Sequence, residues 1–225
     1  MAELEKLQMY IGGQRCDAAS GETFESLYPF TGKAWATVPR GGSEDVDRAV
    51  AAAKKALTTG DWPALTPTQR GHMLRKLGDV LTANAERLGK LEVQDNGKLI
   101  AEMGLQTQYS AQWYYYFGGL ADKIEGSVLP IDKPDTFTYT RSEPLGVVGM
   151  ITPWNSPILL LTWKLAVALA AGNTVVVKPS EFTSASTLAF ADLVEEAGFP
   201  EGVFNVITGY GAEAGEALVT HPDMA

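Results

Sequence analysis

The segment VVGMITPWNSPILLLTWKLAVALAAGNTVVVK, residues 147–178, decides the fold. It begins with a continuous apolar run at 147–151 and ends with a second one at 174–178. Residues 152–155 (TPWN) are typical of a turn, and the apolar residues 157–171 predict a helix. The segment therefore predicts a strand, a helix and a second strand that lies parallel to the first.

The alternation of strand and helix continues downstream. After the strand at 174–178 we expect a turn at 179–183, a helix at 184–197, a strand at 203–207, a turn at 208–211 and a helix at 212–220. Uninterrupted Val/Ile strands that alternate with helices indicate an α/β fold with a Rossmann-like parallel sheet and helices on both faces. Such sheets bind ligands at the carboxyl ends of their strands, so the three strand-to-helix turns should meet at one functional edge.

Upstream of this unit, the first third of the chain is predicted to be helical. Ser43, followed by two acidic residues, is expected to cap one helix, and Thr66-Pro67 to begin another. A third helix should run from Ala85 to the Asn-Gly pair at 96–97, and a fourth from 100 to 123. Residues 126–144 then alternate like a half-exposed strand or hairpin.

Composition narrows the classes of function. The 225 residues are 45% hydrophobic and carry a formal charge of −9, which fits a folded protein and argues against nucleic acid or an anionic membrane as partner. The start of the chain has no signal-like apolar run, and 157–171 falls short of the roughly 20 residues of a spanning helix. The single Cys16 cannot form an internal disulfide, and with only two histidines a zinc site is not expected. We therefore expect a cytoplasmic protein without a metal.

The first two turns carry polar residues with two possible roles. Asn155 just ahead of a helix could donate its amide to a developing oxyanion, or it could simply cap the helix. Lys178 and Glu181 could hydrogen-bond the hydroxyl pair of a ribose, or they could form a surface salt bridge of little energy.

The third turn is rich in glycine. Gly209, Gly211 and Gly215 give the pattern G-x-G-x-x-x-G, which departs by one residue from the usual dinucleotide fingerprint. Glycines at a strand-to-helix turn let the backbone approach a phosphate, but they are also common in any tight turn.

Together these segments resemble the NAD(P)-dependent aldehyde dehydrogenase superfamily along essentially the whole chain. The matching motifs are YIGG (10–13), PFTG (29–32), ADKIEG (121–126), PLGVVG (144–149), ITPWN (151–155), AAGNT (170–174), KPSE (178–181), GFP (198–200), GVFN (202–205) and HP (221–222). The resemblance implies NAD, or NADP, as cofactor, and we expect NAD to be preferred because the carboxylate of Glu181 repels a 2′-phosphate.

The resemblance also implies roles for individual residues. Asn155 matches the asparagine whose amide stabilises the thiohemiacetal oxyanion, and the KPSE residues Lys178, Ser180 and Glu181 match the adenosine-ribose site. The residues expected along the cofactor and beneath its adenosine and diphosphate are Ile151, Thr152, Pro153, Trp154, Gly211 and Gly215. Lys164 matches a place that some relatives assign to a charge relay, although a structural role is favoured for it.

The substrate is implied only as a class. Leu160 and Trp163 match positions that line the aldehyde tunnel, and Tyr109, Gln112 and Trp113 lie on the helix that flanks it. Aromatic walls suit an apolar or a cationic aldehyde. For residues 114–117, however, packing of helix on helix is at least as good an explanation.

The resemblance divides the chain into an incomplete cofactor-binding domain, residues 1–123 and 145–225, and a hairpin arm, 124–144, through which relatives form dimers and tetramers. In the family a cysteine thiolate attacks the aldehyde, hydride passes to the nicotinamide, and a glutamate activates the water that releases the acid. That nucleophile belongs to a catalytic domain absent from these residues, and Cys16 precedes the α/β unit. We therefore expect the cofactor-binding portion of an aldehyde dehydrogenase, which alone is inactive. The alternatives are a non-catalytic module that binds nucleotide or other subunits, and one half of a split enzyme.

Overall fold

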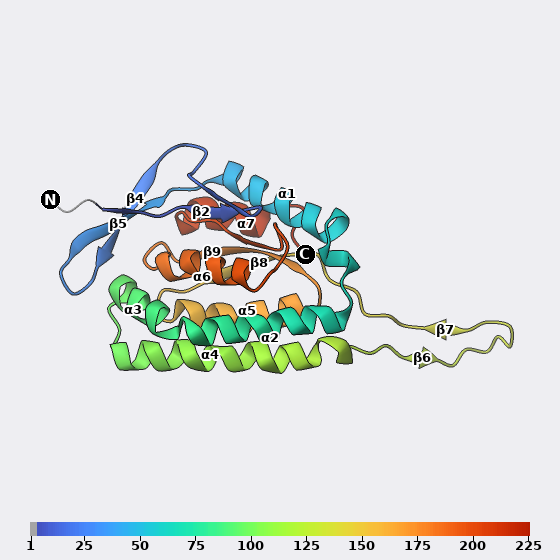
Figure 1. Cartoon of the computed structure of the whole chain (residues 1–225). Helices are drawn as coiled ribbons and strands as arrows, with labels where there is room; N and C mark the ends of the chain where they lie inside the picture. Colours follow the sequence, from blue (N-terminus) through green and yellow to red (C-terminus); the bar gives the residue numbers. More distant parts are fainter. Residues whose placement is uncertain (1–3) are drawn as a thin grey trace.

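A five-stranded sheet lies at the centre of the computed structural model, which describes residues 4–225 (Figure 1). Its strands lie in the order β3 (Gln14–Cys16), β2 (Met9–Ile11), β10 (Phe204–Val206), β9 (Thr174–Pro179) and β8 (Val147–Thr152). The predicted strands β8, β9 and β10 are parallel, as expected. The N-terminal pair β2–β3 adds an antiparallel hairpin beside β10, so the sheet is mixed.

Helices cover both faces of this sheet (Figure 1). The helices α1 (Ser43–Thr59) and α7 (Glu216–Thr220) lie on one face, and α5 (Pro157–Ala170) and α6 (Ala185–Glu196) lie on the other. The side chains of β9 explain why both faces must be covered. Val175 and Val177 are buried against α5 and α6, whereas Val176 is buried against α1. A strand that is apolar on both sides is stable only between two layers.

A second helical layer covers α5 and α6. It consists of α2 (Pro67–Ala83), α3 (Ala85–Asn96) and α4 (Ile100–Leu120). The helices α2 and α4 touch through their backbones, because a Cβ atom on Gly118 would lie 2.8 Å from the carbonyl oxygen of Gly71. The 3-10 turns Trp62–Ala64 and Ala121–Lys123 and the π-helix Gly211–Gly215 complete the helical elements.

The expectation that the first third is helical is wrong for the described residues before Ser43. Besides β2 and β3, they form a separate sheet of β1 (Glu5–Lys6), β5 (Lys33–Pro39) and β4 (Thr23–Tyr28), in that order. The strands β1, β2 and β3 have only two or three residues each, and β4 and β5 have a mixed, half-exposed burial pattern. Capping signals of the helical kind occur only from residue 42 onward, where the predicted helices are present.

The helix boundaries follow from capping. Thr66 and Gln69 form the reciprocal pair of a capping box at the start of α2, with contacts of 3.3 Å and 2.8 Å. The cap of α1 is Gly42 rather than the predicted Ser43, because the buried Asp45 carboxylate accepts the Gly42 N–H at 3.1 Å. The helix α3 ends as predicted at Gly97, whose φ of +75° favours glycine.

The predicted hairpin is present as a thin arm. The strands β6 (Val128–Leu129) and β7 (Thr138–Tyr139) pair antiparallel, and the arm projects away from the body (Figure 1). Its apolar side chains Val128, Phe137 and Tyr139 are exposed. Its role in assembly stays a prediction.

Two negative findings apply to residues 4–225. None of the helices there combines the length and the apolar character that a membrane span requires. The same residues also contain no cluster of three or more His, Cys, Asp or Glu side chains arranged to hold a metal ion.

Candidate functional site

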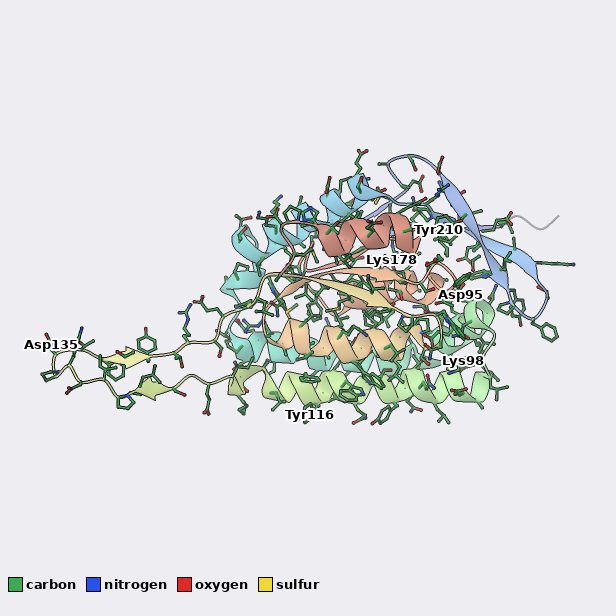
Figure 2. The ribbon with its side chains drawn as sticks, turned by 180° about the vertical axis from the view of Figure 1, so that it is seen from behind. Asp95, Lys98, Tyr116, Asp135, Lys178 and Tyr210 are labelled. Atoms are coloured by element: carbon green, nitrogen blue, oxygen red, sulfur yellow. The ribbon has the colours of Figure 1, made fainter. Side chains whose placement is uncertain are left out.

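The three strand-to-helix turns lie side by side at one edge of the sheet, as expected. The register of β8 and β9 pairs Ile151 with Lys178, and the N–H of Ile207 donates to the carbonyl of Val177 at 2.9 Å. Figure 2 shows Tyr210, Asp95 and Lys98 at the end of the body opposite the arm, which has Asp135 at its tip. The carboxyl edge of the sheet is therefore built from all three turns.

The second turn holds an ion pair between a buried lysine and a half-buried glutamate. Lys178 is only 2% exposed, and its ammonium group donates a hydrogen bond to the Glu181 carboxylate at 3.0 Å. The salt bridge named as the plainer alternative is therefore present, but it is not on the surface. No other hydrogen bond of this ammonium is found within residues 4–225, so two of its three N–H groups are available.

Glu181 is ionised in this environment. Burial raises the pKa of its carboxyl group, but hydrogen bonds from its own backbone N–H, from Lys178 and from the Gly211 N–H outweigh burial and lower it. The contact with Gly211 connects the second turn to the third. Ser180 serves the turn itself, since its hydroxyl accepts the Phe182 N–H at 3.3 Å.

The third turn uses its glycines in different ways. Gly209 has φ +140°, and a Cβ atom there would lie 2.5 Å from the carbonyl oxygen of Gly41, so packing within the chain requires glycine. Gly211 is exposed, and a Cβ atom there would have no described atom within 4 Å. Gly215 is buried at the end of the π-helix. Of these three glycines Gly211 alone is exposed, and its N–H already donates to the Glu181 carboxylate.

The first turn presents apolar surface beside an unengaged amide. Ile151 is 45% exposed and Trp154 is 54% exposed, and Pro153 between them is exposed too. The cap of α5 is Ser156, so the alternative that Asn155 caps this helix is wrong. Asn155 is exposed, and in the described part of the chain its amide has no hydrogen-bond partner. The hydroxyl of Thr152 is buried and likewise unpaired there.

A cavity of about 570 Å³ adjoins the three turns. All three turns contribute to its wall, through Trp154, residues 181–183 and Tyr210. The opposite wall comes from the β4–β5 hairpin and the end of α3. The sequence did not predict this hairpin, and so it did not predict that wall.

The expected tunnel residues lie on α4 and α5. The rings of Trp113 and Trp163 are 5.9 Å apart and bring the two helices together. Trp163 is 44% exposed, Tyr109 is 58% exposed and Leu160 is half-buried. These four side chains therefore form a partly open aromatic surface beside the first turn.

Of the neighbouring side chains on α4 and α5, some are buried in the core and others are exposed. Tyr114 is fully buried and hydrogen-bonds to the Thr162 hydroxyl at 3.2 Å, which confirms the packing explanation for this residue. Tyr116 points outward from α4 and is 61% exposed, so the same explanation is wrong there (Figure 2). Lys164 is exposed and donates to the carbonyl of Leu160 on its own helix at 3.3 Å, which fits the structural role.

Cys16 lies in β3 rather than in a turn. Its side chain is half-buried, and burial raises the pKa of the thiol above its usual value. A nucleophilic cysteine requires the opposite change.

Sequence reasoning missed two groups of residues that hold the turns. Arg40, after β5, contacts the third turn through Glu213, with hydrogen bonds of 3.0 Å and 2.5 Å. Glu92 and Asp95 on α3 are buried carboxylates that accept backbone N–H groups at the starts of α5 and α6. Their i, i+3 spacing places them on one helix face, but nothing in the local pattern shows which elements cover that face.

Comparison with known proteins gives consistent matches. The model of the aldehyde dehydrogenase family matches residues 16–225. The chain is 48% identical over 222 residues to (Z)-2-((N-methylformamido)methylene)-5-hydroxybutyrolactone dehydrogenase of Acinetobacter baylyi, covering 99% of this chain and 45% of that protein. It is 44% identical to aldehyde dehydrogenase family 2 member C4 of Arabidopsis thaliana, covering 100% of this chain and 45% of that protein.

Solved structures agree in fold. The NAD+ complex of aldehyde dehydrogenase from Bacillus cereus matches with a TM-score of 0.94 and 42% identity, over 98% of this chain and 45% of that one. The NAD-dependent aldehyde dehydrogenase from Sinorhizobium meliloti matches with a TM-score of 0.94 and 38% identity, over 99% of this chain and 44% of that one. The chain thus spans a little under half the length of these relatives, and it belongs to the aldehyde dehydrogenase family.

Proposed function

We propose that these residues are the N-terminal, cofactor-binding portion of an enzyme that oxidises an aldehyde to the carboxylic acid with NAD+ as hydride acceptor. The observation that carries the proposal is the ion pair of the buried Lys178 with Glu181 at the carboxyl edge of the sheet, next to the exposed Gly211. The names of the relatives support the reaction, and the NAD+ complex of the Bacillus cereus protein supports the cofactor.

The residues present fit the adenosine end of NAD+. Lys178 has free N–H donors and Glu181 is an ionised acceptor, which suits the two hydroxyl groups of a ribose. The absence of a side chain at Gly211 lets a diphosphate approach the backbone. Ile151, Pro153 and Trp154 offer an apolar strip for the rest of the cofactor. When bound, NAD+ would supply the hydride acceptor.

The same pair favours NAD+ over NADP+. Because the pKa of Glu181 is lowered, its carboxylate is negative at neutral pH. A 2′-phosphate on the ribose would bring a second negative charge to this carboxylate, and like charges within a few ångströms repel.

Asn155 is proposed as the donor that stabilises the oxyanion of the substrate. Its amide is exposed at the carboxyl edge and engaged by no described residue. A preorganised amide N–H directed at developing negative charge is typically worth ~10²–10³ in rate. Tyr109, Trp113, Leu160 and Trp163 would border the path of an apolar or cationic aldehyde.

We also propose the division of the chain into a cofactor-binding domain, residues 1–123 and 145–225, and an arm, residues 124–144. The exposed apolar side chains of the arm would pack against a second copy of the chain in a homodimer or homotetramer. Sedimentation of the whole protein, with and without Phe137→Asp, tests this part separately.

The experiment that tests the proposed function is titration of NAD+ into the whole protein that contains these residues. We expect Lys178→Ala to weaken binding by about tenfold or more, since a hydrogen bond to a charged group is worth roughly 1.5–3 kcal/mol. Lys90→Ala is the matched control, because the Lys90 ammonium is exposed and pairs with Glu86 on the same helix. Equal affinity in wild type and Lys178→Ala would remove the ribose assignment.

Formation of NADH from aldehydes of increasing apolar or cationic character then tests the reaction. Oxidation of any such aldehyde supports the enzyme. Binding of NAD+ without oxidation of any of them would instead favour a nucleotide-binding module.

A further inference from the structure

The helix α3 carries two buried carboxylates, one turn apart, that each reach the start of a different helix. The Glu92 carboxylate accepts the backbone N–H of Ile158, in the first turn of α5, at 2.8 Å. The Asp95 carboxylate accepts the backbone N–H of Ala185, the first residue of α6, at 2.9 Å. Both carboxylates are 2% exposed.

These contacts replace the usual helix caps. The first N–H groups of a helix have no partner within the helix, and a side chain of the N-cap residue normally accepts one of them. Neither Ser156, the cap of α5, nor Ser184, the cap of α6, makes such a bond. Two helices that follow functional turns are therefore capped from outside by one neighbouring helix.

Stability alone does not account for this arrangement. A carboxylate is costly to bury, and well-packed apolar side chains would often hold α3 in place at least as well. Unlike an apolar side chain, a carboxylate forms directional hydrogen bonds. It therefore fixes the position of the N–H or O–H group that donates to it. Asp95 has a second such bond, from the Ser26 hydroxyl at 2.7 Å.

Each capped helix leads back to one functional turn. Asn155 lies three residues before Ile158, and Ser156 between them also contacts the Lys98 ammonium at 3.3 Å. Glu181 lies four residues before Ala185, and its partner Lys178 lies three residues earlier. The position of each turn relative to the sheet therefore depends on where α3 holds the helix that follows it.

We propose that Glu92 and Asp95 are positioning residues with separate tasks: Glu92 positions the Asn155 turn, and Asp95 positions the Lys178–Glu181 turn. Glu92 does not line the cavity beside the turns, whereas Asp95 is part of its wall, and both are proposed to act through the helices that they cap. The proposal rests on the proposed function of those two turns. It predicts that loss of Glu92 impairs turnover and that loss of Asp95 impairs cofactor binding.

Steady-state kinetics of the whole protein separates these effects. Glu92→Met keeps the length of the side chain but removes the acceptor, and we expect kcat to fall about tenfold or more while the KM for NAD+ stays within about twofold. Asp95→Leu should raise the KM for NAD+ by about tenfold, with kcat at saturating NAD+ within about twofold.

Conservative variants provide the rescue. Glu92→Gln retains an oxygen that can accept the Ile158 N–H, so it should lie within about threefold of wild type. Asp95→Asn can keep the Ala185 bond, because the Ser26 hydroxyl can act as acceptor toward the new amide. Equal losses in both kinetic parameters for both apolar variants, or no recovery with the amides, would overturn the proposal.

Hydrogen exchange gives a readout that does not depend on activity. In Glu92→Met, amides of residues 156–160 should exchange faster while those of 183–188 stay protected, and Asp95→Leu should show the reverse. Faster exchange in both segments of either variant would mean that α3 is only a structural support. If the whole protein oxidises no aldehyde, the proposed function fails, but the exchange measurement still decides whether each carboxylate holds its own turn.

Discussion

The guanidinium of Arg40 donates two hydrogen bonds, of 3.0 Å and 2.5 Å, to the carboxylate of Glu213, which lies 173 positions later in the sequence. The same guanidinium lies over the ring of Tyr210, 5.2 Å from its centre. Arg40, which follows β5, therefore contacts the third turn at two points: at Tyr210 and at Glu213 in the π-helix. No local sequence pattern predicts this role of Arg40, because its partners Tyr210 and Glu213 lie near the other end of the chain.

Loss of the Arg40–Glu213 ion pair should make the third turn less well ordered. We expect Arg40→Ala to weaken NAD+ binding by about threefold and Glu213→Gln to have a similar effect, since planar bidentate pairs are the stronger charged hydrogen bonds. The double variant should be no worse than either single variant, because both changes remove one interaction. Titration of NAD+ into all four proteins measures this, and fully additive losses would show that the two residues act independently.

Glu181 should control the choice between the two nicotinamide cofactors. We expect Glu181→Gln to improve kcat/KM with NADP+ by about tenfold, because the variant removes the charge that repels a 2′-phosphate. Use of NAD+ should fall at the same time, because the ribose loses an ionised acceptor. Glu86→Gln is a suitable control on exposed surface. An unchanged preference in Glu181→Gln would place the source of selectivity elsewhere.

Asn155 should matter for turnover and not for cofactor affinity. Asn155→Ala is expected to lower kcat by ~10²–10³ and to leave the dissociation constant of NAD+ within about twofold. Gln108→Ala, at an exposed position of α4, serves as the control. A kcat within about twofold of wild type would exclude an oxyanion role.

The stability of the fold should fall as pH rises from about 5 to about 8. Burial raises the pKa of Glu92 from 4.5 to about 7, even though the Ile158 N–H, Lys98 and the Ser186 hydroxyl on α6 oppose the change, and Asp95 adds to it. Burial likewise raises the pKa of Asp95 from 3.8 to about 6, against the Ser26 and Ala185 hydrogen bonds. Groups with raised carboxyl pKa values stabilise the fold fully below their unfolded pKa, and this contribution is lost as pH rises through the folded pKa.

Urea unfolding at both pH values tests this expectation. The free energy of unfolding of wild type should be lower at the higher pH by on the order of 1–3 kcal/mol. Glu92→Gln, which cannot ionise, should show a smaller difference. If Glu92→Gln shows the same difference in unfolding free energy as wild type, the pH dependence comes from groups other than Glu92.

The parallel strands and the helices after residue 42 were predictable because their signals are local. The apolar run at the start of β8 and the Thr66–Gln69 capping box each act within a few residues. The strands before Ser43 were not predictable in the same way, since β1, β2 and β3 have two or three residues each and β4 and β5 are only partly buried. Their stability comes from pairing, as in β10 with β2, where Val206 lies opposite Tyr10.

The site was predictable only in its polar residues at the strand ends. Lys178 and Glu181 are three positions apart in a turn, so their pairing is a local event. The contact of Glu92 with Ile158 spans 66 positions, and it depends on how α3 packs onto α5. A buried carboxylate looks the same in the sequence as an exposed one, so the supporting residues of the site became visible only in three dimensions.

The close approach of α2 and α4 at Gly71 and Gly118 has a consequence for how substrate range could evolve. Any side chain at either glycine would push α4 outward, and α4 carries Trp113 opposite Trp163 on α5. In the substrate path proposed above, the spacing of these two indole rings thus depends on two glycines that do not border it. Selection for bulkier aldehydes there could act on the spacing of backbones and leave every wall residue unchanged.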